Sequence, residues 1–128
     1  MTALAMDVQV RPGTTMSSLR RELTTALRDL DEDHLYDVQL VVTELVSNVL
    51  DHTPAGAGRL RILRSQEPCL VTVEVDDESA VEPVYGRSRL GEYRGRGIVV
   101  VDNISREWGF RPREEGGKTV YAMVDCTG

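Results

Sequence analysis

The sequence predicts a single domain of the α+β class, in which helices pack on a β-sheet. Three observations support this prediction. The chain has 128 residues, which is enough for one hydrophobic core and short for two. Residues 34–52 repeat apolar side chains with the period of an α-helix, whereas residues 59–64 and 70–76 have the apolar and β-branched pattern of strands. We therefore expect one domain over residues 1–128.

The first half of the chain predicts one strand and two helices. Residues 6–10 alternate apolar and polar side chains before Pro12-Gly13, which is typical of a short edge strand. Thr14 or Thr15 can cap a first helix that runs to about Leu30. The acidic run 31–33 supplies a cap and favourable negative charge for a second helix over residues 34–52. The apolar side of that helix has seven members: Leu35, Val38, Val41, Val42, Leu45, Val46 and Val49.

The second half predicts a hairpin, a long loop, a short helix and two more strands. The strands 59–64 and 70–76 flank a turn at residues 66–68 and should pair with each other. Residues 77–97 show no periodicity and are rich in glycine and arginine, and loops of this length in compact domains are usually functional. A helix over about 98–105, a strand over 107–111, a turn at Gly116-Gly117 and a strand over 119–124 complete the chain.

Composition narrows the class of protein. A formal net charge of -6 and a pI near 4.9 argue against direct nucleic-acid binding, which requires positive charge on some face. No apolar run approaches the roughly 20 residues of a membrane span, and residues 1–11 lack the pattern of a signal peptide. We expect a cytoplasmic protein in which Cys69 and Cys126 are reduced thiols without an assigned role.

The second helix carries a row of polar residues that suits phosphate chemistry. Residues four apart stack on a helix, so Glu44, Asn48 and His52 share one ridge with Asp51 beside it. Asparagine offers a hard carbonyl oxygen for Mg2+, and glutamate can orient or deprotonate a hydroxyl group. The same residues would also suit the solvated side of an ordinary surface helix, so this ridge alone does not decide the function.

Two further stretches point to a ligand. Strand alternation places Asp77 on the same side as Val71, Val73 and Val75, where a carboxylate is costly unless it is paired, for example with a ligand amine. A turn aspartate that hydrogen-bonds its own loop is the alternative. The segment 94–97, Arg-Gly-Arg-Gly, precedes an apolar run, and a glycine-rich helix start with nearby arginines suits phosphate. The alternative is an ordinary solvated loop.

These signals together resemble a known family. The chain reads Glu44-x-x-x-Asn48-x-x-x-His52, then a strand ending in Asp77, then Gly95-Arg96-Gly97 before a helix, then Gly116-Gly117-Lys118-Thr119 before a last strand. This order resembles the GHKL ATPase superfamily over nearly the whole chain. Within it, the sequence is most similar to the stand-alone anti-sigma-factor serine/threonine kinases of the RsbW and SpoIIAB type, in particular the actinobacterial ones. The resemblance implies the Bergerat fold, a two-layer α/β sandwich whose mostly antiparallel sheet is covered on one face by three helices.

The resemblance also implies a site for ATP and Mg2+. Glu44 would be the general base or water-orienting carboxylate, and Asn48 would be the Mg2+ ligand. Asp77 would accept a hydrogen bond from the adenine amino group, and Thr119 would help to hold the base, although Lys118 adjoins the same family position. The full set of implied cofactor-binding residues is Asn48, Asp51, His52, Asp77, Arg94, Gly95, Arg96, Gly97 and Thr119.

The implied function is phosphorylation of a serine on a small antagonist protein, together with binding of a sigma factor, by a homodimer. One departure from the family favours an alternative. The first glycine box, Asp-x-Gly-x-Gly in the superfamily, reads Asp77-Glu78-Ser79-Ala80-Val81, and valine does not readily adopt the positive φ that glycine allows. The alternative is a binding module that regulates a partner by contact and holds nucleotide weakly. The catalytic half of a histidine kinase is a weaker interpretation, because we find no helix with a phosphoacceptor histidine before the domain.

Overall fold

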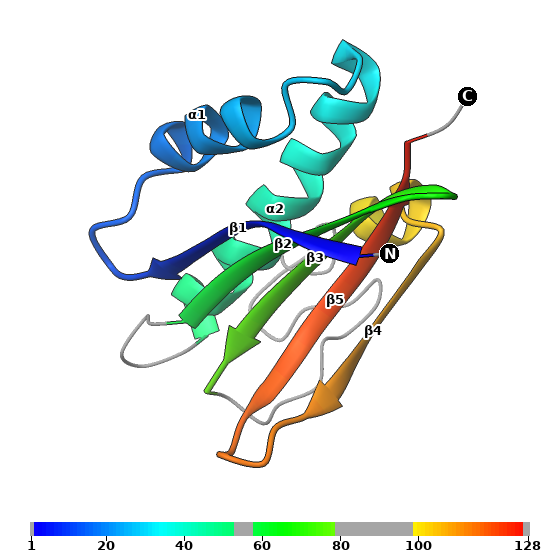
Figure 1. Cartoon of the computed structure of the whole chain (residues 1–128). Helices are drawn as coiled ribbons and strands as arrows, with labels where there is room; N and C mark the ends of the chain where they lie inside the picture. The colour runs from blue at the N-terminus through cyan, green and yellow to red at the C-terminus, as the bar shows by residue number, and fades with distance from the viewer. Residues whose placement is uncertain (1, 53–57, 79–98, 127–128) are drawn as a thin grey trace.

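The computed structural model describes residues 2–52, 58–78 and 99–126 of the chain. The elements follow the order β1 (Thr2–Val10), α1 (Met16–Ala26), α2 (Glu32–His52), β2 (Gly58–Gln66), β3 (Cys69–Asp77), β4 (Glu107–Pro112) and β5 (Lys118–Asp125). Residues 99–104 are also helical. The strands form one sheet, and the helices lie on one side of it (Figure 1). The α+β class that the sequence predicts is therefore confirmed.

The sheet has five strands in the order β1-β2-β3-β5-β4, and each of its four neighbouring pairs is antiparallel. β1 lies at an edge and β2 pairs with β3 as a hairpin, as the sequence predicts. β3 lies at the centre, between β2 and β5. The residues at the end of β3 therefore meet the beginning of β2 on one side and the beginning of β5 on the other.

The core lies between the helices and one face of the sheet. α2 packs against β3 and β5, and α1 packs against α2 and β1. Alternation along β3 turns Val71, Val73 and Val75 into this core, so Thr72, Glu74 and Asp76 belong to the face that none of the described helices covers. We call these two sides the helix-facing side and the open face. No helix among the residues that the structure describes is long and apolar enough to cross a membrane.

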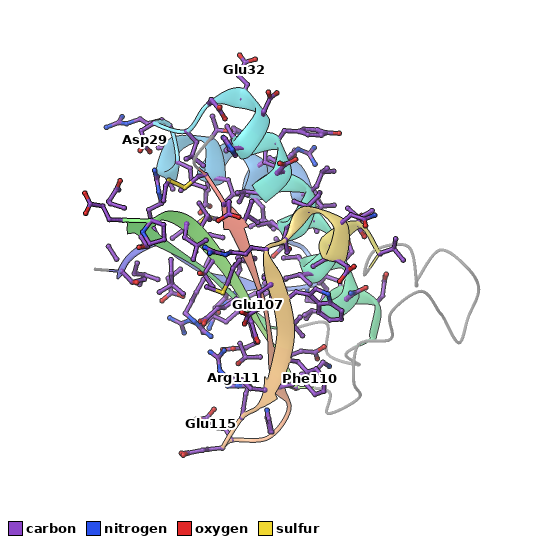
Figure 2. The ribbon with its side chains drawn as sticks, turned by 90° about the vertical axis from the view of Figure 1, so that its right-hand side faces the viewer. Asp29, Glu32, Glu107, Phe110, Arg111 and Glu115 are labelled. Atoms are coloured by element: carbon purple, nitrogen blue, oxygen red, sulfur yellow. A yellow bond between two sulfur atoms is a disulfide. The ribbon has the colours of Figure 1, made fainter. Side chains whose placement is uncertain are left out.

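The edge strand β4 shows the same division between two sides. Phe110 and Arg111 follow each other and point to opposite sides of the strand (Figure 2). Arg111 reaches Glu74 across the open face, with Nη2 and Oε2 3.0 Å apart. Phe110 pairs with the core residue Val120 but remains 38% exposed. Trp108, two residues earlier on the same strand, packs on the core and donates its indole N–H to Asp102 at 2.8 Å.

The helix starts agree with the capping residues in the sequence, and most boundaries lie within two residues of the prediction, but two differ by four residues. Thr15 accepts a hydrogen bond from the Ser18 N–H, and Asp31 accepts one from the His34 N–H. α1 ends at Ala26 rather than near Leu30, because the chain turns there while its later leucines still pack on the core. β1 begins at Thr2 rather than at residue 6. Its pairing with β2 shifts register between Leu4 and Met6, and this irregularity breaks the alternation.

The two cysteines form a disulfide, so the expectation of two reduced thiols is wrong for this structure. Cys69 begins β3, and Cys126 follows the last residue of β5. The N–H of Cys126 donates to the carbonyl of Cys69 at 3.2 Å, and their Cα atoms lie 5.1 Å apart. The antiparallel register of β3 and β5 brings the two residues together across a sequence separation of 57. That register was not visible in the sequence.

Candidate functional site

The polar ridge of α2 lies along one edge of the apolar stripe. Glu44 and Asn48 are half-buried, one turn apart, whereas Asp51 is exposed on the last turn. His52 is the last residue of α2, and its side chain lies outside the part that the structure describes. Among the described residues, no hydrogen bond or ion pair engages the carboxylate of Glu44 or the side-chain amide of Asn48. Within the part of the chain that the structure describes, both groups are available to a ligand.

Burial also changes the acidity of Glu44. Removal of the carboxylate from water disfavours its charged form, which raises the pKa of Glu44 above the ordinary value of 4.5. A carboxylate with a raised pKa is a stronger base than an exposed one. The position of Glu44 therefore suits a group that accepts a proton from a hydroxyl.

The end of α2 lies over the end of the sheet that holds Asp77. Gly58, the first residue of β2, pairs with Asp77 in the sheet. A Cβ atom added to Gly58 would lie 3.0 Å from Cγ1 of Val49, so the start of β2 packs against the Val49 side chain of α2. Val49 directly follows Asn48 on α2. The turn of α2 that carries Asn48 and the strand end that carries Asp77 therefore belong to the same end of the domain.

Asp77 is buried on the helix-facing side, as strand alternation predicts. It is the last residue of β3, and its partner across the sheet is Lys118, the first residue of β5. The Nζ atom of Lys118 lies 3.1 Å from Oδ2 of Asp77, and the two side chains are only 7% and 4% exposed. A buried ion pair of this kind carries a large desolvation cost, so it is weak evidence for a purely stabilising role. It places an ammonium donor beside a carboxylate acceptor.

Thr119 lies on the other side of the sheet. Its hydroxyl donates to Oδ1 of Asp76 at 2.7 Å, on the open face. Because successive residues of a strand alternate between faces, Lys118 and Thr119 cannot both reach the helix-facing side. The structure therefore does not bring Thr119 together with Asp77, and its assignment to the nucleotide base remains a prediction that this geometry disfavours.

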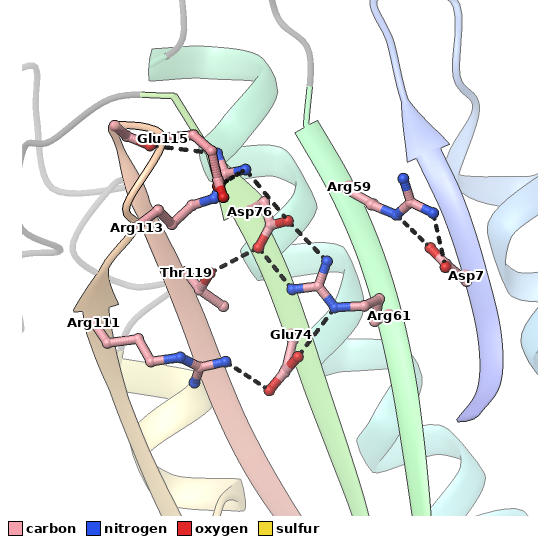
Figure 3. Close-up of polar contacts among 10 residues, drawn as sticks. Asp7, Arg59, Arg61, Glu74, Asp76, Arg111, Arg113, Glu115 and Thr119 are labelled. Atoms are coloured by element: carbon pink, nitrogen blue, oxygen red, sulfur yellow. Dashed lines mark hydrogen bonds and ion pairs between the residues drawn. The ribbon is translucent and has the colours of Figure 1, made fainter. Parts of the chain in front are cut away.

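Asp76 anchors a network on the open face that the sequence did not reveal. Arg61 reaches Asp76 with two hydrogen bonds, at 2.7 and 2.8 Å, and reaches Glu74 at 3.1 Å (Figure 3). Nη2 of Arg113 lies 4.0 Å from Oδ2 of Asp76. Burial by itself would raise the pKa of Asp76, but hydrogen bonds from Arg61 and Thr119 outweigh it and hold the pKa below 3.8. The carboxylate of Asp76 is thus held by protein groups.

A tight turn closes the same end of the sheet. Gly117 adopts a φ of 76°, which is left-handed backbone that favours glycine. A Cβ atom at Gly117 would also overlap the carbonyl oxygen of Asp77 and lie 2.8 Å from Cα of Glu78. The glycine lets the turn before β5 pack directly on the backbone of residues 77–78, and this contact sets where Lys118 begins its strand.

The phosphate-binding prediction falls on Arg94, Gly95, Arg96 and Gly97, and all four lie outside the described residues, as does the rest of the altered glycine box, 79–81. Within the described residues, no group of three or more His, Cys, Asp or Glu side chains could hold a metal ion. Asn48 nevertheless fits one role in Mg2+ binding, because its amide oxygen is a hard ligand without another partner there. Mg2+ commonly takes one or two protein ligands and completes its shell with phosphate and water oxygens.

The comparisons with known proteins agree with the fold. A family model described as a histidine kinase-like ATPase domain matches residues 8–124, a range that includes the ridge of α2, the end of β3 and the start of β5. No curated protein matches the chain. The family match covers most of the sequence. The chain therefore belongs to the histidine kinase-like ATPase family, within the GHKL superfamily.

Proposed function

We propose that this protein is an ATP-binding regulator that works as a Mg2+-dependent serine/threonine protein kinase of the anti-sigma-factor type. The main supporting observation is that Glu44 and Asn48, both half-buried and unengaged within the described residues, belong to α2, whose later turns pack near the strand end that carries buried Asp77. An ATPase fold with these three side chains at one end supports nucleotide binding there.

Each of the three residues has a distinct role in this proposal. Asn48 holds Mg2+ through its amide oxygen, and the bound Mg2+ neutralises phosphate charge. Asp77 accepts a hydrogen bond from the base. Glu44 accepts the proton of the attacking serine hydroxyl, for which its raised pKa and partial burial are suited. Phosphoryl transfer depends mainly on positioning and charge neutralisation, so a site with few reactive side chains is sufficient.

The partners in this proposal are a small antagonist protein, which supplies the serine, and a sigma factor, which the kinase binds as a homodimer in the cytoplasm. The resemblance to stand-alone anti-sigma-factor kinases supports these assignments. The net charge of -6 supports action through proteins rather than through direct contact with nucleic acid.

A second function is a contact regulator without phosphoryl transfer. Two observations favour it: the carboxylate of Asp77 already binds Lys118, and the first glycine box lacks its glycines. In this case the fold would bind the sigma factor or antagonist, and ATP would bind weakly and without turnover.

The deciding experiment is calorimetric titration with ATP, in the presence and absence of Mg2+. We expect binding that depends on Mg2+ and that falls at least about tenfold in Asn48→Ala, because a metal ligand is lost. Asn103→Ala is the matched control, because Asn103 is an exposed asparagine in the helical segment 99–104. A wild-type protein that binds no ATP at millimolar concentration would refute the kinase proposal and leave the contact regulator.

A transfer assay then separates the two functions. The protein is incubated with γ-labelled ATP, Mg2+ and a purified anti-sigma-factor antagonist. We expect label on a serine of the antagonist with the wild type and little label with Glu44→Gln. Tight ATP binding without any labelled antagonist would favour the contact regulator.

A further inference from the structure

We propose that Cys69 and Cys126 form a site of thiol–disulfide exchange, in which a dithiol reductant opens their disulfide and Arg64 stabilises the thiolate that leaves on Cys69. The site goes beyond the proposed function, because it lies far from Asp77 and needs no nucleotide. The nine-residue strand β3 begins at Cys69 and ends at Asp77, which places the two residues roughly 26 Å apart.

The guanidinium group of Arg64 lies beside the disulfide. Its Nη2 atom is 3.6 Å from Sγ of Cys69. Arg64 is also tied to the turn after α1, because Nη1 and Nη2 donate to the two carboxylate oxygens of Asp29, each at 3.0 Å (Asp29 is labelled in Figure 2). The Arg64 side chain is only 11% exposed, whereas that of Asp29 is 60% exposed. A positive charge is therefore held in a fixed place next to one of the two sulfur atoms.

One donor of Arg64 has no partner while the disulfide is closed. Its Nε atom is buried and makes no hydrogen bond within the residues that the structure describes. Asp29 takes the edge of the guanidinium formed by Nη1 and Nη2, so the contact of Nη2 with Sγ lies toward the edge that Nη2 shares with Nε. A disulfide sulfur is a weak acceptor, whereas a thiolate is charged. Opening of the bond therefore gives Arg64 a charged acceptor at the edge that holds its unpartnered donor.

The surroundings of the pair leave it open to a small thiol. Both cysteines are partly exposed. Further charged residues come from the elements that meet at this end: Arg28 and Asp29 after α1, Glu67 between β2 and β3, Arg106 before β4, and Asp125 on β5. Arg106 binds Asp125 at 3.3 Å, so that pair offsets its own charge. Within the described part of the chain, the charged group that donates to a sulfur atom is Arg64.

The exchange consists of two displacement steps. First, a thiolate of the reductant attacks Sγ of Cys126, the bond between the two cysteines breaks, and its electron pair leaves on Sγ of Cys69. Second, the other thiolate of the reductant attacks its own sulfur in the mixed disulfide, and the electron pair leaves on Sγ of Cys126. The dithiol loses two electrons and two protons and becomes a disulfide, while the two cysteines gain them and become thiols. A more stable thiolate leaves faster, so Arg64 directs attack to Cys126.

Alkylation of the reduced protein tests the role of Arg64. The full chain is reduced with dithiothreitol, freed of reductant and treated with iodoacetamide at a series of pH values, and mass spectrometry follows each cysteine. Because the thiolate is the reactive form, we expect the rate at Cys69 to be half-maximal below about pH 8.5, the ordinary value for a thiol. Arg64→Gln should move this midpoint up by about one pH unit. Asp29→Asn should move it down, because the carboxylate no longer offsets the charge of Arg64.

Arg106→Gln is the matched control, because Arg106 is an exposed arginine at the same end that binds Asp125 and not sulfur. It should leave the midpoint of Cys69 unchanged. Reduction of the oxidised protein by dithiothreitol, followed by gel shift after capture of free thiols with a maleimide, should be about threefold slower in Arg64→Gln than in the wild type. If Arg64→Gln does not fold, the wild-type profile and Asp29→Asn decide.

Two results would overturn the proposal. A midpoint of Cys69 at or above about pH 8.5 in the wild type would show that Arg64 does not stabilise a thiolate. A disulfide that resists millimolar dithiothreitol until denaturant unfolds the protein would be a structural bond and not an exchange site. Neither result bears on ATP binding, because no nucleotide is present.

Discussion

Asp76 and Asp77 are neighbours at the end of β3, yet they lie on opposite sides of the sheet in different environments. Asp76 is held by Arg61 and Thr119 in a network that extends across the open face (Figure 3). Asp77 lies toward the helices, where it binds Lys118, near a helix whose Glu44 and Asn48 have no partner among the described residues. The two adjacent aspartates, Asp76 and Asp77, therefore have different roles.

The difference shows how a sheet separates stability from function. Charged groups on the open face satisfy one another, so they fix the register of β2, β3 and β5 without requiring a ligand. On the helix-facing side, Glu44 and Asn48 have no hydrogen-bond or ion-pair partner within the described residues, which is typical of a binding site. The following predictions test this separation.

The largest effect should come from the helix-facing side. We expect Glu44→Gln to reduce phosphoryl transfer to the antagonist by about 10²- to 10⁴-fold, the usual contribution of a general base, while ATP affinity changes little. Transfer rates at saturating ATP measure this effect. Glu22→Gln, an exposed change on α1, is the control and should leave the rate unaltered. An equal loss of ATP affinity and rate would mean that Glu44 binds nucleotide instead.

Replacement of Asp76, on the open face, by asparagine should reduce the stability of the fold and leave ATP binding nearly unchanged. We expect a loss of roughly 2–3 kcal/mol in the free energy of unfolding, because Arg61 keeps a half-buried charge without its main partner. Denaturant unfolding measures this loss. The affinity for ATP should stay within about threefold of the wild type. A tenfold weaker affinity would show that the two sides are not separate.

The stability that Asp76 contributes should depend on pH. Its folded-state pKa lies below the ordinary value of 3.8, so its contribution is present above that value and is lost as pH falls through the folded-state pKa. The difference in unfolding free energy between the wild type and Asp76→Asn should be constant between about pH 7 and pH 5 and should shrink below about pH 4. A difference that stays constant from pH 5 down to pH 2 would contradict this account.

The turn before β5 offers a comparison between two adjacent glycines. Both have positive φ, but only Gly117 packs against the backbone of residues 77–78, while Gly116 has open space around it. We expect Gly117→Ala to reduce the free energy of unfolding by about 2 kcal/mol or more, and Gly116→Ala by about 1 kcal/mol. Thermal unfolding of the two variants measures the difference. Equal losses would mean that backbone strain alone, and not the contact with Asp77, accounts for the effect.

The smallest effect should again involve Glu44, now as a stability change. A raised pKa means that the folded protein favours the protonated form, so this favourable contribution is complete below pH 4.5 and is lost as pH rises through the folded-state pKa. At pH 7 the charged carboxylate therefore costs stability. Glu44→Gln should be slightly more stable than the wild type at pH 7 and equally stable at pH 4. A destabilised Glu44→Gln at pH 7 would contradict the effect of burial.

Much of the fold was accessible from the sequence because local signals were strong. The period of α2, its acidic start and the alternation of β3 each predicted an element and its buried side, including the inward position of Asp77. The boundaries of β1 and α1 were predicted less accurately. A register irregularity interrupts the alternation of β1, and α1 ends at Ala26 although the leucines that follow it still pack on the core.

Contacts between distant segments were not accessible in this way. The alternation that places Asp77 inward also places its neighbour Asp76 on the opposite side, but it does not show that Arg61 and Thr119 meet Asp76 there. The same limit applies to the side on which Lys118 and Thr119 lie, because the first residue of β5 is decided by the turn at Gly117. The register between strands, which short-range patterns do not encode, controls each of these contacts.

The bond between Cys69 and Cys126 makes a closed covalent ring of the chain between them. This ring contains β3, β4 and β5 and the residues predicted to cradle phosphate, whereas α1 and α2 lie outside it. A protease that cuts the oxidised protein once, anywhere inside the ring, therefore releases no fragment. The two pieces should migrate as one species in electrophoresis until a reductant separates them.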